Sequence, residues 1–334
     1  MRICVFGAGA VGGHLAAKLA AAGHEVSAIA RGAQLQAIRR NGLKLIHGDQ
    51  VIQGPVAPAE KASELGSQDF VIVATKASAL PAVAREILPL LKDDTGVVFA
   101  QNGVPWWYAV GLNAGLAASR PKPPDLSRLD PGGALKEAVA PQRIIGAVVY
   151  SANDLVEPGV VKNHTPGNNM LVVGECDDAS SSRISKLREI LEKSGISSPA
   201  TGDIRQAVWN KLVLNLGTST LCVLAGCTVG EMRADPQLAA IAKRIAEEGR
   251  AIARAHGVDP DGAPPRPSGG HGAGAIGHKP SILQDYESGR PMEIEAQLVA
   301  TLAFARAAGV QTPTLDSLIP LAVHKAAAKG LYTT

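Results

Sequence analysis

Short apolar runs alternate with helical patterns through the first hundred residues. The runs are short and rich in Val, Ile and Ala, as in fully buried parallel strands. This alternation predicts an α/β domain with a parallel, doubly wound sheet of Rossmann type. The predicted strands are Arg2–Phe6, Glu25–Ala30, Phe70–Ala74 and Gly96–Ala100, with helices ending near Gly23 and covering residues 33–41 and 80–91, and a hairpin at 43–56.

The pattern changes after residue 105. Residues 105–141 are rich in Pro, Gly and Ala and predict an insertion or long loop with room for a short helix. Three further strands and a helix are predicted at 144–152, 159–163, 170–174 and 181–194. From about residue 203 only the 3.6-residue period remains, which predicts helices at 203–225, 235–256, 293–308 and 314–329.

We therefore predict two domains. Residues 1–200 form the Rossmann-type domain, and residues 201–334 form an all-helical domain. The run at 264–277 is so rich in Gly and Pro that a mobile surface loop is expected there. A length of 334 residues fits two domains, and 46% hydrophobic residues exclude intrinsic disorder.

Charge and cysteine content narrow the class of protein. The 33 basic residues against 30 acidic ones give a net charge of +3, too balanced for a nucleic-acid or membrane-surface partner. The four cysteines are scattered and predict neither a disulfide framework nor a zinc site. No signal peptide and no membrane-length apolar run is present, so we expect a soluble, cytoplasmic protein. We also expect no metal site, since His271 and His278 alone cannot close one.

The strongest motif follows the first strand directly. Gly7, Gly9 and Gly12 form a G-x-G-x-x-G turn that opens a helix, with Ala8, Ala10 and Val11 between them. Such a turn lets the backbone approach a pyrophosphate, which the helix N-terminus then attracts. A glycine-rich turn without a ligand is the alternative.

The end of the second strand indicates which cofactor is bound. An NAD site usually has Asp or Glu there for the ribose 2′-hydroxyl, whereas this chain has Ala30-Arg31-Gly32. Arg31 can pair with a 2′-phosphate, so the sequence predicts NADP (NADPH). A solvated surface cation is the alternative for Arg31.

Polar residues follow two further strands. Lys76 comes after the third predicted strand, and Gln101-Asn102-Gly103 follows the fourth. Ligands of open α/β sheets bind at the carboxyl ends of the strands, so both positions are candidates. For Asn102 a simple turn with Gly103 is an equally good explanation.

The helical domain carries its own candidates. Lys211, Asn215 and Ser219 recur every four residues and share one helix face. Ser281 and Glu293 lie farther along the chain, and Glu293 stands near the first turn of a predicted helix, where the helix dipole alone would favour it. Taken singly, each of these residues is better explained by structure than by catalysis.

Together these motifs resemble the ketopantoate reductase (2-dehydropantoate 2-reductase) family, whose members reduce 2-dehydropantoate to pantoate with NADPH on the path to pantothenate and coenzyme A. The resemblance rests on the glycine turn, Arg31, the T-K-A segment at Lys76, the N-G pair at Asn102, and the segments around Lys211, Ser281 and Glu293. It implies that Lys211 is the general acid and Glu293 its carboxylate partner. It further implies that Asn102, Asn215, Ser219 and Ser281 hold the substrate or the lysine, and that residues 7–12, Arg31, Lys76 and Asn102 bind the cofactor.

Three features depart from the family pattern. Ser219 stands where an Asn is usual, Leu298-Val299 stands where an Asn-Gly pair is usual, and the insertion carrying Trp106-Trp107-Tyr108 is longer. The aromatic residues either add apolar surface beside Asn102 or pack the inserted loop. All three departures concern the substrate side.

The sequence therefore predicts an NADP-dependent oxidoreductase that acts on 2-dehydropantoate, a small 2-oxo acid. A reductase of another branched or aromatic 2-oxo acid is one alternative, and a non-catalytic NADP sensor is another. A sensor would need neither Lys211 nor Glu293. The oligomeric state is not fixed by the sequence, and a homodimer stays open.

Overall fold

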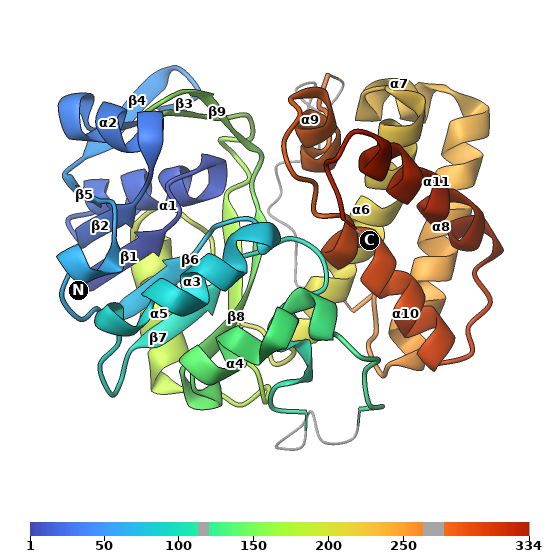
Figure 1. The fold of residues 1–334 in the computed structure, drawn as a ribbon, viewed down its shortest axis with the longest axis horizontal. Coiled ribbons are helices and arrows are strands. Elements are labelled where there is room, and N and C mark those ends of the chain that lie inside the picture. Colours follow the sequence, from blue (N-terminus) through green and yellow to red (C-terminus); the bar gives the residue numbers. More distant parts are fainter. Residues whose placement is uncertain (113–119, 263–276, 334) are drawn as a thin grey trace. The chain divides into compact units, whose positions relative to one another are not determined.

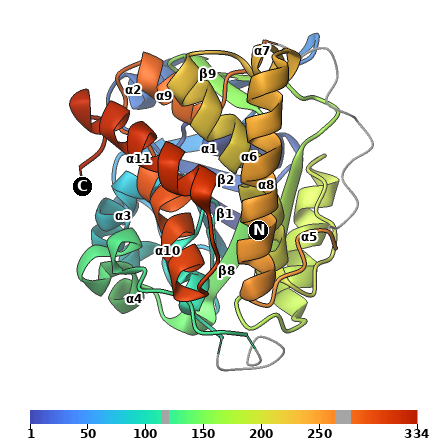
Figure 2. The ribbon, with the colours of Figure 1, turned by 90° about the vertical axis from the view of Figure 1, so that its right-hand side faces the viewer.

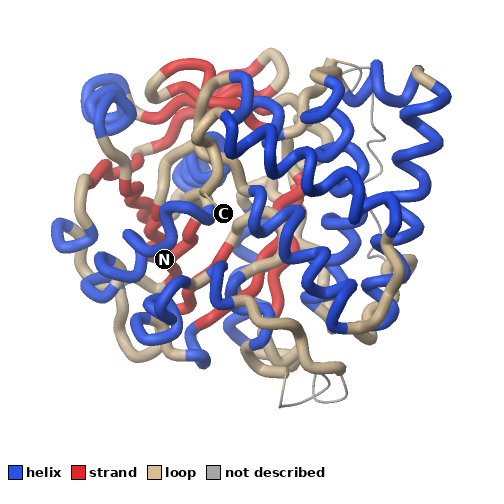
Figure 3. Tube along the Cα trace, turned by 45° about the vertical axis from the view of Figure 1, so that its right-hand side comes forward, coloured by secondary structure: helices blue, strands red, loops and turns tan. Residues whose placement is uncertain are grey.

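The computed structural model describes residues 1–112, 120–262 and 277–333. The chain divides into two compact units. The first comprises Met1–Gln101 and Asp130–Ile204, and the second comprises Asn102–Leu129 and the described residues from Arg205 onward. Among the described residues, all strands belong to the first unit, and the second consists of helices and loops (Figure 3).

A seven-stranded sheet organises the first unit, in the order β11-β8-β7-β6-β1-β2-β5 (Figure 1). All neighbouring pairs from β5 to β8 are parallel, whereas β11 pairs antiparallel with β8. The buried apolar runs predict β1, β2, β6 and β7 as parallel strands, but the partly exposed β5 was not predicted. The strands are β1 Arg2–Phe6, β2 Glu25–Ile29, β5 Val56–Ala59, β6 Phe70–Val73, β7 Gly96–Phe99, β8 Ile144–Tyr150 and β11 Met170–Glu175.

A second, four-stranded sheet has the order β4-β3-β10-β9. Its hairpin was predicted, but β9 was not, because that segment is exposed and carries little apolar periodicity. The strands are β3 Leu43–His47, β4 Gln50–Gly54, β9 Asn153–Glu157 and β10 Val160–Asn163. The helices of this unit are α1 Ala10–Ala21, α2 Gly32–Asn41, α3 Leu80–Glu86, α4 Ala134–Ala138 and α5 Ser182–Lys193.

Helix α3 is shorter than predicted. It ends at Glu86 and is followed by a 3-10 turn at Leu88–Leu90. Pro89 disfavours α geometry at the residue before it, which explains why the apolar pattern continues to Leu91 while the α-helix does not.

The second unit is a set of packed helices. Gly249 of α8 lies against Val213 and Leu216 of α6, and Gly217 of α6 lies against Ala242, so small residues let the two helices run close together (Figure 2). The helices are α6 Ile204–Ala225, α7 Val229–Ala234, α8 Pro236–Ala255, α9 Ser281–Glu287, η10 Glu295–Val299, α10 Ala300–Ala307 and α11 Pro313–Ala328. No helix of the described ranges is long and apolar enough to span a membrane.

Part of the predicted insertion belongs with these helices. Residues 105–141 are predicted to belong to the first domain, but the structure groups Asn102–Leu129 with the helical unit. The reason is Arg205, whose buried guanidinium donates hydrogen bonds to the carbonyl oxygens of Tyr108, at 2.9 and 3.0 Å, and Val110, at 2.6 Å. The short helix expected in the insertion is present as α4. Of the predicted loop at 264–277, all but residue 277 lies outside the described residues.

Helix α1 contacts strands of both sheets and is buried almost all round. It therefore buries two basic residues, His14 and Lys18, which are 1% and 7% exposed. The Lys18 ammonium donates to the Gly195 carbonyl oxygen at 2.9 Å. Burial, helped by the charge of Lys18 and by His47, lowers the pKa of His14 to about 3.

We expect acid to destabilise this unit through His14. Between pH 6.5 and about 3 the histidine takes up a proton in the unfolded chain but not in the folded one, so stability falls as the pH falls, by up to ~1.4 kcal/mol per pH unit. Amide hydrogen exchange of α1, measured from pH 6.5 to 4, should show this slope, and H14L should flatten it. The exposed His324 supplies the control variant H324Q, which should keep the wild-type slope. If H14L kept the wild-type slope, His14 would not be the cause of the loss of stability at low pH.

Candidate active site

The carboxyl ends of four parallel strands bring the first set of candidates to one edge of the large sheet. Phe6 of β1 pairs with Ile29 of β2 and Val73 of β6, and Val73 pairs with Phe99 of β7. The glycine turn, Arg31, Lys76 and Gln101 follow these strand ends directly, so they share that edge. Gln101 ties β6 and β7 together, since its Nε2 donates to the carbonyl oxygens of Val73, at 2.9 Å, and Thr75, at 3.1 Å.

Two of the three motif glycines are required by packing. Gly7 has a φ of +103°, and a Cβ on it would lie 2.6 Å from Cγ2 of Thr75. A Cβ on Gly12 would lie 2.0 Å from the Gly7 carbonyl oxygen and 3.0 Å from Cγ1 of Val5. These glycines allow the tight turn and the close approach of α1 to the sheet.

Gly9 has a different environment. It is the N-cap of α1, without a side-chain cap, and a Cβ on it would meet nothing within 4 Å. The protein's own packing therefore does not require glycine at this position, and the free space lies at a helix N-terminus, where backbone N–H groups attract an anion. The adjoining backbone is fixed, since Nε2 of Gln34 donates to the Ala8 carbonyl oxygen at 2.7 Å. These features fit the pyrophosphate of a dinucleotide.

Arg31 is the N-cap residue of α2, and its side chain is 58% exposed. Its Nη2 lies 2.5 Å from Oε1 of Glu86, the last residue of α3. Arg31 therefore forms an ion pair while its side chain stays largely exposed. Lys76 is the residue before the 3-10 turn Ala77–Ala79 and is half-buried.

Three of the candidates in the second unit lie together. Nζ of Lys211, on α6, donates to Oδ1 of Asn102 at 2.5 Å. Glu293 directly precedes the helical turn at Ile294 and interacts electrostatically with the same ammonium. Burial lowers the pKa of Lys211 to about 8, and the carboxylate of Glu293 opposes that shift. This arrangement gives a cationic acid that can release its proton near neutral pH.

The segment after Asn102 is fixed against the π-helical turn η10. Gly103 has a φ of +85°, and a Cβ on it would lie 2.4 Å from the Ala296 carbonyl oxygen. The Val104 N–H donates to that same oxygen at 2.7 Å. Gln297, which sequence reasoning missed, is 2% exposed and its Nε2 lies 3.4 Å from Oε2 of Glu293. No motif of the sequence indicated the contact between Gln297 and Glu293.

The remaining candidates on the substrate side differ in exposure. Asn215 is half-buried one turn after Lys211, and Ser219 is 3% exposed one turn later. Ser281 is the first residue of α9 and is exposed. Lys211, Asn102 and Glu293 are thus the cluster that the described contacts define.

The aromatic residues of the insertion pack inside the helical unit. Trp107 is fully buried beside the Arg205 guanidinium, and the Tyr108 hydroxyl accepts a hydrogen bond from Trp209 Nε1 at 2.8 Å. The Tyr108 ring also meets Phe304 edge-on at 4.9 Å. Of the two explanations open at the sequence level, packing of the inserted segment therefore accounts for Trp107 and Tyr108.

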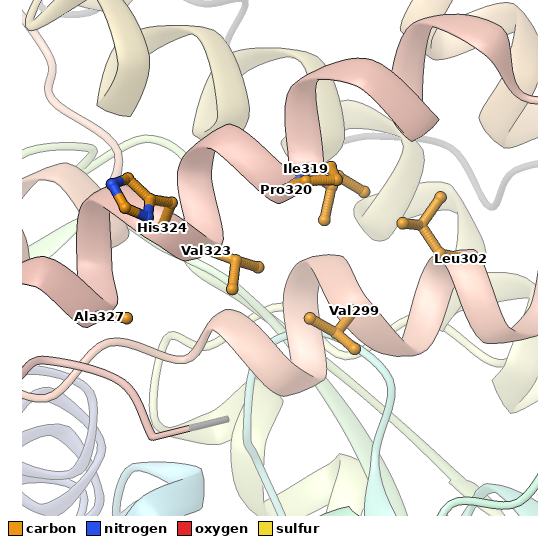
Figure 4. A pocket seen from close by; sticks show the side chains of 7 residues that line it. All are labelled: Val299, Leu302, Ile319, Pro320, Val323, His324 and Ala327. Carbon is orange, nitrogen blue, oxygen red and sulfur yellow. The ribbon is translucent and has the colours of Figure 1, made fainter.

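The two residues of the Leu298-Val299 pair lie in different environments. Leu298 is fully buried, and Val299 lines an apolar groove along α10 and α11 (Figure 4). His324 is the only titratable residue of the described groove lining. The groove is lined by Val299, Leu302, Ile319, Pro320, Val323, His324 and Ala327. It lacks the acid and carboxylate that the Lys211 cluster offers.

The chain is similar to known proteins over both of its units. Residues 3–106 match the family model "Ketopantoate reductase PanE/ApbA", and residues 203–326 match its C-terminal counterpart. The chain is 43% identical, over the full length of both proteins, to a 2-dehydropantoate 2-reductase of Mesorhizobium japonicum. A crystal structure of a proposed ketopantoate reductase from Ralstonia solanacearum is 34% identical, covers 99% of both chains and has a TM-score of 0.83. A D-mandelate dehydrogenase solved with NADH and anilino(oxo)acetate shares the fold at 22% identity, covers 99% of this chain and 100% of its own, and has a TM-score of 0.78.

The glycine turn on a parallel sheet, the helical unit and these matches define an oxidoreductase of the pyridine-nucleotide-dependent class. Within that class, the chain belongs to the ketopantoate reductase family. The resemblance drawn from the sequence and the fold class, a Rossmann-type sheet followed by an all-helical domain, are confirmed.

We expect G103A to disturb the Lys211 cluster. The new Cβ would collide with the Ala296 carbonyl oxygen in an unfavourable backbone region, which together costs about 2–4 kcal/mol and shifts Asn102 away from Lys211. The melting temperature and kcat of G103A should both fall. Gly132 also has a positive φ, of +73°, but no atom within 4 Å of a Cβ, so G132A is the matched control and should lose only stability. Equal kcat values in the two variants would show that Asn102 is not held through Gly103.

Proposed function

We propose that this protein reduces 2-dehydropantoate to pantoate with NADPH, and that the first unit binds the nucleotide while the second supplies the acid. The observation that carries the proposal is the contact of Lys211 with Asn102, next to Glu293, in a chain 43% identical to a 2-dehydropantoate 2-reductase. NADPH, when bound, would supply the hydride that reduces the ketone carbon.

The roles of the residues in the second unit follow from the charge that develops. As the ketone is reduced, its oxygen becomes an alkoxide, which a positioned ammonium stabilises and protonates. Lys211 donates this proton from Nζ and is left neutral. Asn102 orients the ammonium through its amide oxygen, and Glu293 favours the charged form until the proton is transferred. Asn215, Ser219 and Ser281 are proposed to contact the substrate.

The nucleotide contacts are assigned to the first unit and to Asn102. The backbone of residues 7–12 and the N-terminus of α1 are proposed to bind the pyrophosphate, which the open space at Gly9 supports. Arg31 is proposed to bind the 2′-phosphate, and Lys76 and Asn102 are proposed to contact the nucleotide as well. The absence of an acidic residue after β2 favours NADPH over NADH.

The direct test is oxidation of NADPH and of NADH with a panel of 2-oxo acids that includes 2-dehydropantoate, 2-oxoisovalerate and an aromatic 2-oxo acid. The proposal expects the fastest turnover with NADPH and 2-dehydropantoate. Faster turnover of another 2-oxo acid would favour the alternative reductase. Binding of NADPH without turnover of any acid would favour a sensor.

Lys211 should control the pH dependence and the rate of the reaction. Since the acid must be protonated, kcat should fall as the pH rises through about 8, the pKa of Lys211. K211A should lower kcat by roughly 10²–10⁴, the usual contribution of a positioned acid, and should remove that titration. Steady-state rates from pH 6 to 10 measure both effects.

The affinity for NADPH serves as the folding control in this experiment, since K211A should leave it nearly unchanged. The exposed Lys243 of α8 supplies the matched variant K243A, which should keep the wild-type profile. If K211A retained most of the wild-type kcat, another group would have to donate the proton.

We further expect relaxed discrimination among branched substrates. Ser219 shares a helix face with Lys211, and it is shorter than the Asn usual in the family. A site that hydrogen-bonds a substrate hydroxyl rejects analogues without it by about 10⁴–10⁵, whereas an apolar pocket discriminates by only ~10–200-fold. The ratio of kcat/KM for 2-dehydropantoate to that for 2-oxoisovalerate should therefore be near or below ~10².

A ratio above about 10⁴ would mean that other polar groups bind the hydroxyl and that Ser219 is neutral. The variant S219N separates these explanations, since it should raise the ratio if the missing amide is the cause.

A further inference from the structure

Arg31 and Glu86 form an ion pair whose geometry bears on the choice of nucleotide. The Nη2–Oε1 distance is 2.5 Å, and the side chains are 58% and 30% exposed. The contact uses one oxygen only, because Oε2 of Glu86 is buried and has no hydrogen-bond partner among the described residues. A pair held through one oxygen at a partly exposed position can be exchanged for another anion.

Resting on the proposed function, we infer that Glu86 is a specificity-determining residue that competes with the nucleotide's 2′-phosphate for Arg31. A 2′-phosphate carries nearly two negative charges and must either displace the carboxylate or share the guanidinium with it. A nucleotide without that phosphate does not meet this competition. Glu86 therefore makes the ratio of the affinities for NADPH and NADH smaller than Arg31 alone would make it.

The position of Glu86 supports this role. Glu86 is the last residue of α3, the helix that follows β6 and Lys76. Glu86 therefore belongs to the same unit as Arg31 and Lys76, two side chains proposed to bind the nucleotide. The sequence did not reveal Glu86, because 55 residues separate it from Arg31 and no motif connects them.

The test measures binding of two nucleotide fragments by titration calorimetry at low salt. Adenosine 2′,5′-bisphosphate carries the 2′-phosphate and 5′-AMP does not. E86Q should bind the bisphosphate about 3–10-fold more tightly than the wild type. This range is expected because the variant lacks both the partly exposed ion pair with Arg31 and the repulsion between the carboxylate and the phosphate. The affinity for 5′-AMP should change less than twofold, and the NADPH/NADH ratio of kcat/KM should rise in parallel.

A matched control removes a carboxylate from the opposite end of β2. Glu25 pairs with Arg2 at 3.2 Å and is exposed, so E25Q changes the net charge of the unit by the same amount. It should leave both affinities unchanged, which separates a local effect from a general one.

R31A separates this inference from the proposed function. If R31A does not weaken binding of the bisphosphate, Arg31 does not bind the 2′-phosphate, and that part of the proposed function fails. If R31A weakens it but E86Q leaves it unchanged or weaker, the proposed role of Arg31 stands and the inference about Glu86 is overturned.

Discussion

Keeping an ammonium charged at a partly buried position is the constraint on which the Lys211 cluster of the helical unit depends. Burial favours the neutral amine of Lys211 and lowers its pKa to about 8, and the carboxylate of Glu293 opposes that shift. The amide oxygen of Asn102 accepts one of the ammonium's protons at 2.5 Å. Three segments far apart in sequence must therefore meet, which requires the segment from Asn102 to join the helices although it follows a strand of the other unit.

The same constraint explains why glycine occupies position 103. Its backbone is in the left-handed region and lies directly against the Ala296 carbonyl oxygen, which also accepts from Val104. The π-helical turn η10 widens the helix just where Glu293 enters it and Gln297 reaches back to that carboxylate. Such turns often occur at functional sites, and here Ala296 and Gln297 of the turn contact the segment after Asn102 and the carboxylate of Glu293.

Much of this could be predicted from the sequence, because periodicity and glycine spacing are local signals. The parallel strands, the glycine turn and the long helices follow from such patterns. The antiparallel pairing of β11, the strand β9 and the membership of residues 102–129 depend on contacts between distant segments, which no local pattern encodes. The contacts of Gln297 and Glu86 were missed for the same reason, and the buried Tyr108 shows how an apparent substrate-side departure can belong to the core.

Lys211 and Arg31 show two different uses of a positive charge. An amine can lose its proton within the range that burial and a carboxylate set, so a partly buried Lys can act as an acid. A guanidinium presents several N–H donors in a fixed planar arrangement that suits an anion, which is the role proposed for Arg31. The carboxylates beside them differ accordingly. Glu293 raises the pKa of Lys211, whereas Glu86 is proposed to act by competing for the donors of Arg31. Lys211 and Glu293 are both partly buried, whereas the Arg31 side chain is 58% exposed and so stays accessible to a ligand from solution.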